Sequence, residues 1–379
     1  MKILLLGEYS RLHNSLKEGL ISLAHEVTLV SDGDGFKNFP NDISIRASLT
    51  NTFPLRYLKL AIYKIFKIDL NELERGLRCL FILKKIKKFD VVQFINEKPI
   101  KTIPSLERYL LKKIFSQNSK VFLLSCGVDT ISVKYMMDKK LRYSLMDTYF
   151  LEPTLKKEFS YVLEYTENHM RKTHELVFSN IKGVIASDFD YVLPLKNHKK
   201  YLGLIPNPVN PNEFLFQQPS IDQKIIIFLG INRGTYHPKG IPFFEKALKI
   251  IQDKYLDKVE VIIVENIPYK EYISLYNDAH IILDQVYSYD QGYNALEAMA
   301  KGKVVFTGAE KEFLIHYTLK VDEVCINALP NAEYLAKKIG ELIEHPHRIN
   351  EIGKGARAFI EREHDFQKVA KKYLETYNL

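Results

Sequence analysis

Residues 224–248, KIIIFLGINRGTYHPKGIPFFEKAL, contain a strand, a turn and the start of a helix in one short segment. The apolar run 224–229 is the strand, and Gly230 ends it. Gly240 opens a helix that the apolar spacing predicts to continue to residue 252. A continuous apolar strand followed directly by an amphipathic helix is typical of a parallel sheet covered by helices on both faces. We therefore expect an α/β fold.

The same alternation continues to the C-terminus and is also found in the first half. In the second half we expect strands at 259–264, 280–283, 303–306 and 323–326, helices at 269–278 and 292–300, and a helical tail after residue 332. In the first half we expect strands at 2–6, 26–30, 43–45, 90–95, 120–125, 183–186 and 201–205, and helices at 11–24 and 104–115, with 130–175 mostly helical. This order predicts doubly wound parallel sheets with right-handed crossovers.

A proline-rich segment, IPNPVNPNEF at 205–214, separates the two halves. Its prolines cannot continue a helix or a central strand. A chain of 379 residues is also too long for one ordinary core. We therefore expect two domains, residues 1–206 and 207–365, with a hinge at 205–211.

The cysteines and the apolar runs indicate where the protein resides. Cys79, Cys126 and Cys325 are far apart and form no CxxC or Cys/His pattern, which argues against a disulfide framework or a zinc site. The N-terminal apolar run is too short for a signal peptide, and no run reaches the ~18 apolar residues that cross a bilayer. We expect a cytoplasmic protein, either free or peripheral on the inner face of the cell membrane.

Two passages of the second half suit a diphosphate. In the turn after 224–229, Arg233 and Lys239 supply positive charge, and Gly240 opens a helix whose N-terminus is partly positive. In GYNALEAMAKGKVV (292–305), a second helix begins at Gly292, and Glu297 is placed to accept hydrogen bonds from ribose hydroxyls. The alternatives are a solvated basic loop and a helix with one surface glutamate. The position directly after buried strands favours a ligand site.

Four passages together resemble the retaining glycosyltransferases of family 4 (glycosyl transferases group 1), which have the GT-B fold. The resembling pairs are IPNPVN (205–210) with IPNGVD, FLGINRGTYHPKG (228–240) with the strand–turn–KG phosphate site, GYNALEAMAKGKVV with GFGLVLLEAMACGKPVV, and ISLAHEVTLV (21–30) with GHEVTVV. The order and spacing fit along the whole chain, and LEAMAKGKVV is the most specific passage.

The resemblance implies two Rossmann-like domains facing a central cleft. The acceptor would lie on the N-terminal domain and a nucleotide-diphosphate sugar on the C-terminal one, with helix 366–379 packing back on the first. It also implies a hexosyltransferase that retains anomeric configuration and uses neither metal nor cofactor. The acceptor would be a glycan or a lipid-linked intermediate of bacterial surface polysaccharide or lipopolysaccharide synthesis.

Carried over residue by residue, the resemblance names the site. The expected donor-binding residues are Gly7, Gly230, Arg233, Lys239, Tyr289, Asp290, Gly292, Tyr293, Asn294 and Glu297. The expected catalytic residues are Arg233, Lys239 and Glu297, with Asp129 on the acceptor side, and the two cations would stabilise the leaving diphosphate.

The sequence departs from the family pattern at the donor helix. The family has two acidic residues eight positions apart, and Glu297 matches the second. Tyr289 occupies the first position. Asp290 could replace that acid with a shift of one residue, Asp284 could reach in, or the first acid is missing.

The N-terminal domain departs as well. Its first loop, GEYSRLHNS, has one glycine where the family has a pair, and LLSCGVDT (123–130) has no counterpart of the family's histidine. His13 and His169 lie elsewhere in that domain. We expect a small buried thiol at Cys126. We expect Asp188 to cap a helix. We expect His237 to be a turn residue or to contact phosphate, and Glu310 or Glu312 to contact the sugar.

The first half is the basic half. Of the net charge of +8, residues 1–205 carry +11 and the remainder −3. The stretch 55–89 has ten basic and three acidic residues on a helical pattern broken near 67–69. An anionic membrane surface is one candidate partner, and lysine-lined helices packed on a sheet are the alternative. No nucleic-acid recognition module is found, so that partner is not expected.

Three other functions remain in view. A catalytically silent GT-B subunit would explain the missing acid and histidine. A nucleotide-sugar epimerase has the same architecture but needs no acceptor site. A nicotinamide-dependent dehydrogenase is disfavoured because no GxGxxG follows the first strand.

Overall fold

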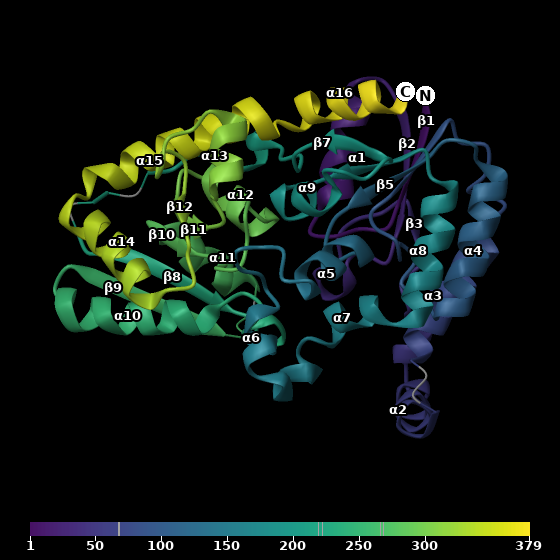
Figure 1. Ribbon diagram of the computed structural model, residues 1–379, viewed down its shortest axis with the longest axis horizontal. Helices are drawn as coiled ribbons and strands as arrows, with labels where there is room; N and C mark the ends of the chain where they lie inside the picture. Colours follow the sequence, from purple (N-terminus) through teal and green to yellow (C-terminus); the bar gives the residue numbers. More distant parts are fainter. Residues whose placement is uncertain (67–68, 219, 222, 266, 268) are drawn as a thin grey trace.

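The computed structural model describes residues 1–66, 69–218, 220–221, 223–265, 267 and 269–379. These residues form two α/β domains that lie side by side, with the two chain termini close together on one of them (Figure 1). Each domain is built on a parallel sheet. The predicted α/β class with two doubly wound parallel-sheet domains is therefore confirmed.

The N-terminal sheet has the order β3-β2-β1-β4-β5-β6-β7, and its described pairs are all parallel. The strands are β1 (Lys2–Leu6), β2 (Glu26–Ser31), β3 (Ile43–Ser44), β4 (Val91–Phe94), β5 (Val121–Ser125), β6 (Gly183–Ala186) and β7 (Tyr201–Leu204). The helices are α1 (Leu12–Ser22), α2 (Leu55–Phe66), α3 (Leu70–Ile82), α4 (Pro104–Gln117), α5 (Thr130–Met137), α6 (Asp147–Leu151), α7 (Ser160–Leu163), α8 (Asn168–Asn180) and α9 (Phe189–Leu195). The central strands β4 and β5 are buried at every position, because helices cover both faces.

The C-terminal sheet has the order β12-β11-β10-β8-β9 and is also parallel. The strands are β8 (Ile225–Ile231), β9 (Val259–Glu265), β10 (Ile281–Leu283), β11 (Val304–Thr307) and β12 (Ile326–Asn327). The helices are α10 (Ile241–Tyr255), α11 (Tyr269–Asp278), α12 (Tyr293–Ala300), α13 (Lys311–Tyr317), α14 (Ala332–Glu344), α15 (His347–Phe359) and α16 (Phe366–Tyr377). Strand β12 begins three residues later than expected and pairs only with the last two residues of β11.

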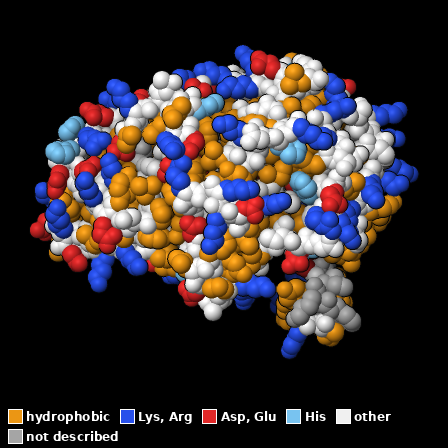
Figure 2. All heavy atoms as spheres, in the orientation of Figure 1, with side chains coloured by type: hydrophobic (Ala, Val, Ile, Leu, Met, Phe, Trp, Pro, Cys, Tyr) orange, Lys and Arg blue, Asp and Glu red, His pale blue; other side chains and the backbone are white. Residues whose placement is uncertain are grey.

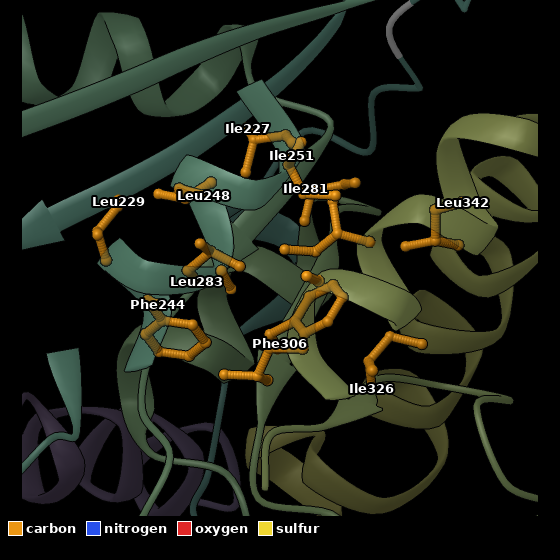
Figure 3. Packing of buried hydrophobic residues seen from close by; sticks show 14 of the residues in the cluster. Ile227, Leu229, Phe244, Leu248, Ile251, Ile281, Leu283, Phe306, Ile326 and Leu342 are labelled. Carbon is orange, nitrogen blue, oxygen red and sulfur yellow. The ribbon is translucent and has the colours of Figure 1, made fainter. Parts of the chain in front are cut away.

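One core of the C-terminal domain holds the ends of β8 and β10 in place. Strand residues Leu229, Leu283 and Phe306 pack against Phe244 of α10 (Figure 3). Helix α14 closes the same cluster through Leu342. These side chains are almost fully buried, so the loops that follow the strands start from fixed points.

The chain passes between the domains twice, and the two crossings are bonded to each other. The Val209 N–H donates to His364 O at 2.7 Å, and the Phe366 N–H donates to Val209 O at 3.0 Å. After the second crossing, α16 packs on α1 in one core of the N-terminal domain, through Tyr373 and Tyr377. Figure 1 shows α16 running along the top of the molecule to the N-terminal domain.

The basic stretch 55–89 forms two helices, and only the second packs as a sheet-covering helix does. Helix α3 buries Gly76 and Cys79, whereas α2 leaves nearly every side chain exposed. The expected break near 67–69 falls partly outside the described residues. Among the described residues, no helix has the length and apolarity needed to cross a bilayer.

Candidate functional site

The carboxyl ends of β8 and β10 form the switch point of the C-terminal sheet. From β8 the chain goes to β9 on one side, and it returns to β10 on the other side of β8. Open α/β sheets bind ligands in the crevice at such a point. The loops that border it are 232–240 after β8 and 284–292 after β10.

Lys239 and Asp284 meet in this crevice. The Lys239 ammonium lies 3.1 Å from the Asp284 carboxylate, and Asn294 donates to the same oxygen at 3.0 Å. The Val286 N–H donates to Lys239 O at 2.9 Å, which ties the two loops together. Asp284 is buried, whereas the Lys239 side chain is 37% exposed. Asp284 therefore holds the cation in place while part of the ammonium stays open to the cleft.

Helix α12 begins beside this cation. Gly292 is its N-cap, and the first N–H groups of a helix have no acceptor within the helix. The Tyr293 hydroxyl donates to Pro208 O and so fixes the start of α12 to the interdomain segment. The result is an N-terminus of partial positive charge next to Lys239.

Glu297 is half-buried one turn further along α12. Burial raises its pKa, and the charges of Lys301 and Arg11 lower it. In the described part of the chain, no hydrogen bond or ion pair reaches its carboxylate. Arg11 belongs to the N-terminal domain, so Glu297 lies near the junction of the two domains, although it is not among the residues that line the cavity between them.

A cavity of about 310 Å³ lies between the domains at this edge. Its C-terminal-domain lining includes Thr235, Pro238, Lys239, Gln285, Tyr287, Ser288, Gln291, Gly292 and Tyr293. Its N-terminal-domain lining includes Tyr9, Ser10, Cys126, Gly127, Ser132, Asp188, Asp190 and Tyr191. The N-terminal domain therefore covers the crevice of the C-terminal sheet.

The structure places Arg233 away from this cavity. Its guanidinium lies 2.7 Å from Glu265 at the end of β9 and covers the ring of Tyr236. The predicted contact between Arg233 and a phosphate would require the guanidinium to leave Glu265. Of the two predicted cations, the structure brings only Lys239 into the cavity lining.

The candidates for the first acid differ in position. Tyr289 is buried, and its hydroxyl accepts from the Arg142 N–H at 2.7 Å. Asp290 is buried under the loop, where it accepts from the N–H groups of Gln291 and Phe189. Only Asp284 lies at the crevice itself. Gly230 lies within β8, where a side chain would meet the Tyr272 ring, so it packs rather than lines the cavity.

Comparisons with known proteins agree with this architecture. Residues 242–375 match a family model described as glycosyl transferase-like. The chain has the GT-B fold. The predicted resemblance to group 1 glycosyl transferases is therefore confirmed. No curated protein sequence matches the chain.

Three solved structures illustrate the fold. Sucrose-phosphate synthase from Thermosynechococcus elongatus superposes with a TM-score of 0.63 at 16% identity, covering 100% of this chain and 98% of that one. Anabaena Alr3699/HepE in complex with UDP and glucose gives 0.62 at 12% identity, covering 100% and 99%. A Listeria monocytogenes protein described as a UDP-N-acetylglucosamine 2-epimerase gives 0.51 at 11% identity, covering 99% and 94%. At these identities the likeness establishes the GT-B fold.

The first loop of this GT-B chain is closed by its own carboxylate. Glu8 accepts from the N–H groups of His13 and Asn14 at the start of α1, and burial raises its pKa to about 7. Gly7 has φ +87°, and a side chain there would collide with Ile95. The structure therefore gives Gly7 a packing role, and the start of α1 is already occupied by Glu8. The predicted contact of Gly7 with the donor has no support in this arrangement.

Asp129 is the N-cap of α5. Its carboxylate accepts from the Ser132 N–H at 2.7 Å and from the Ser125 hydroxyl, and it does not line the cavity. Cys126 does line the cavity, and burial raises the pKa of its thiol. His13 is buried against Gly7 O, and burial lowers its pKa to about 3. The structure therefore supplies neither Asp129 nor His13 as an acid–base group at the cavity.

Sequence reasoning missed one acidic residue of the cavity. Asp188 caps α9 as expected, by accepting from the Asp190 N–H at 3.0 Å. Asp190 itself reaches the C-terminal domain, where it accepts from the Ser288 hydroxyl at 2.6 Å and the Tyr289 N–H at 3.1 Å. Both carboxylates line the cavity. The position of Asp190, in the loop and helix start directly after a parallel strand, was the signal that could have found it.

A helical excursion of the N-terminal domain, residues 138–167, contacts two segments of the C-terminal domain: the loop after β8 and the start of α13. The Arg142 guanidinium binds both oxygens of Glu312 at 2.6–2.7 Å and Glu310 at 2.6 Å. On the other side, Glu158 accepts from the N–H of His237 and lies 2.7 Å from its ring Nδ1. Glu310 and Glu312, which were expected to approach the sugar, therefore form ion pairs with Arg142. His237 binds Glu158 of the excursion.

We expect Arg142→Ala to open the cleft. Glu310 and Glu312 lose their shared cation across the domain interface, and part-exposed ion pairs of this kind contribute about 1–2 kcal/mol. The donor KM should rise by about tenfold, with a smaller change in kcat. Small-angle scattering should show a larger radius of gyration. Arg171→Ala, which removes an exposed pair with Glu175 on α8, is the matched control and should change neither quantity.

Proposed function

We propose that this protein is a glycosyltransferase whose donor is a nucleoside-diphosphate sugar bound at the switch point of the C-terminal domain. The observation that carries the proposal is the placement of Lys239 beside the N-terminus of α12 in the interdomain cavity. An ammonium and free backbone N–H groups at one crevice are what a diphosphate requires. The similar HepE structures contain UDP or UDP-glucose, so a uridine donor is the first to test.

In this proposal each residue has one task. Lys239 and the N–H groups of Gly292, Tyr293 and Asn294 bind the diphosphate and stabilise the charge that grows on it as the glycosidic bond breaks. Glu297 accepts hydrogen bonds from the ribose hydroxyls. Asp284 positions Lys239. Arg233 is assigned a supporting role that depends on release from Glu265.

The acceptor and the stereochemistry are proposed from the charge of the N-terminal half and from the sequence resemblance. The basic N-terminal half suits an anionic glycan or lipid-linked acceptor of surface polysaccharide synthesis. The sequence resemblance supports retention of configuration, hexosyl transfer and independence of metal. The α or β configuration of the product tests retention. The rate in the presence of a chelator tests independence of metal.

Thermal unfolding with UDP, GDP, TDP, ADP and CMP tests the donor site. A ligand at ~100 times its Kd stabilises by about 2.7 kcal/mol, which raises Tm by a few degrees in a protein of this size. We expect one diphosphate, UDP first, to stabilise the wild type. Glu297→Ala should lose that response because the ribose loses its acceptor.

The matched control is Glu351→Ala, which removes an exposed glutamate of α15 far from the cavity lining. It should keep the full ligand response. If no nucleotide stabilises the wild type, the donor site is refuted and the silent-subunit function takes its place. Nucleotide binding without donor turnover would also favour a silent subunit.

An epimerase is the second candidate, because Asp188 and Asp190 place two carboxylates in the cavity. Proton transfer at a sugar carbon needs such groups. The ones found here are already engaged, by Ser187 and by Ser288 with Tyr289. Product analysis separates the functions, since an epimerase converts the donor without releasing nucleoside diphosphate.

A further inference from the structure

Helix α2 projects from the N-terminal domain as an arm (Figure 1). Its apolar side chains do not pack on the body: Leu58 is 51% exposed, Leu60 61% and Ile65 70%. Of the helix positions whose burial is described, only Lys59 and Ile62 are half-buried. Exposed apolar side chains contiguous along a whole helix are uncommon on a protein with no partner and mark an interaction surface.

The base of the arm is firmly bonded, so the exposure is not that of a loose segment. Glu74 of α3 accepts from the N–H groups of Ser48, Leu49 and Thr50, which precede α2. These bonds lower the Glu74 pKa to about 2 against the opposing effect of burial. Lys59 reaches Asn51 at 2.6 Å. The arm is therefore held at its root, and Leu58, Leu60 and Ile65 are exposed further along it.

The charges of α2 are of one sign. Leu58, Ala61 and Ile65 share one side at helical spacing, Arg56 lies opposite them, and Lys64 borders that side next to Ala61. Leu60 lies between the two cations. No aspartate or glutamate occurs in Leu55–Phe66. Figure 2 shows hydrophobic and basic side chains together on this arm at the lower right. An apolar face bordered by cations matches the boundary between acyl chains and anionic head groups.

The length of α2 determines its orientation relative to a bilayer. Twelve residues make a helix about 18 Å long, short of the ~30 Å hydrocarbon core. Such a helix lies in the plane of the interface instead of crossing the bilayer. A second copy of the chain is a poorer occupant. It would bring like charges together, and a footprint of roughly 200 Å² is far below the ~800 Å² per partner of stable interfaces.

We propose that α2 is a membrane-surface anchor that inserts its Leu58–Ala61–Ile65 face into a bilayer containing anionic lipid. Arg56 and Lys64 then lie at the level of the lipid phosphates. The charge of +11 on residues 1–205 draws this domain toward the same surface. The proposal does not depend on the donor site, because its test measures lipid binding and not activity.

The protein has no tryptophan, so one introduced indole reports on its own surroundings. We would place it at Ile65→Trp in the full chain and add phosphatidylcholine vesicles with about 30% phosphatidylglycerol. The emission should shift to the blue and be quenched by brominated acyl chains. Leu256→Trp, at an exposed position of the C-terminal domain, is the matched control and should show neither effect. An Ile65→Trp spectrum unchanged by these vesicles would overturn the proposal.

Vesicle flotation tests the same face by removal. Leu58→Glu/Ile65→Glu should reduce binding at least about tenfold, whereas Ile250→Glu/Leu256→Glu, which adds the same charge to exposed positions on and next to α10, should not. Binding should also fall on pure phosphatidylcholine and at high salt. Equal binding by both variants would contradict insertion. A dimer that Leu58→Glu/Ile65→Glu dissociates, without vesicle binding by the wild type, would assign α2 to self-association.

Discussion

Lys239→Ala is expected to lower kcat by about 10²–10³-fold, equivalent to ~3–4 kcal/mol of transition-state stabilisation. In the proposed reaction the leaving diphosphate gains charge beside the Lys239 ammonium, and the described cavity lining offers no arginine to replace it. Arg233 is bound to Glu265 and points elsewhere. The rate of nucleoside-diphosphate release at saturating donor and acceptor measures the effect.

Two further variants make this result specific. Lys239→Arg keeps a cation beside Asp284 and should recover part of the rate, whereas Lys249→Ala removes an exposed lysine of α10 and should cost nothing. Since Lys239→Ala also leaves the buried Asp284 without its cation, Tm must be compared first. A Lys239→Ala protein with unchanged Tm and wild-type kcat would remove this residue from the reaction.

Secondary structure was largely predictable here because both sheets are parallel and buried. Strands such as β4, β5 and β8 are apolar at nearly every position, and the helices α4 and α10 that follow β4 and β8 have a clear apolar stripe. Strand β12, which has two residues, was misplaced because its pairing depends on two residues of β11. Residues 130–175 were expected to be mostly helical but could not be divided into elements, because they form short helices that pack on one another and on α4 and α9 of the same domain and leave no long periodic stripe.

The donor side of the site was more predictable than the acceptor side for a physical reason. Lys239 and Gly292 follow directly from a strand and a helix start, so local sequence fixes their position. The direction of a long side chain is set by its neighbours, and Glu265 draws Arg233 away. Arg142 and Asp190 act across the domain interface, at separations of about a hundred residues or more, which no local pattern reveals.

The acidic residues at this interface make the contact between the domains sensitive to pH. Burial, together with the charge of Asp190, raises the pKa of Asp290 to about 7 against the opposing effect of two backbone hydrogen bonds. Burial also raises the pKa of Asp190 to about 6 and that of Asp188 well above its usual range. Asp290 belongs to the C-terminal domain and the other two to the N-terminal domain. Ionisation above neutral pH therefore places like charges on both sides of the closed interface.

Asp290→Asn is expected to stabilise the protein increasingly as the pH rises. An acid whose folded pKa lies above its unfolded value of 3.8 favours folding fully below pH 3.8 and loses that contribution as the pH rises to about 7. Asparagine does not titrate, so the variant does not lose this part of the free energy of unfolding, which is at most ~4 kcal/mol. His13 and His364, whose pKa values burial lowers to about 3 and 4, have the opposite slope. Both histidines are present in the wild type and in Asp290→Asn, so their contributions cancel in the difference between the two free energies of unfolding.

The measurement is the free energy of unfolding of the wild type and Asp290→Asn between pH 5 and 8. The difference should grow toward pH 7 and then level off, whereas Asp253→Asn on the exposed face of α10 should give a flat difference. Scattering at pH 8 should show the wild type more open than the variant, because only the wild type carries charge at both Asp190 and Asp290. A difference independent of pH would mean that Asp290 is already ionised at pH 5, and that repulsion between these residues does not set the opening of the cleft.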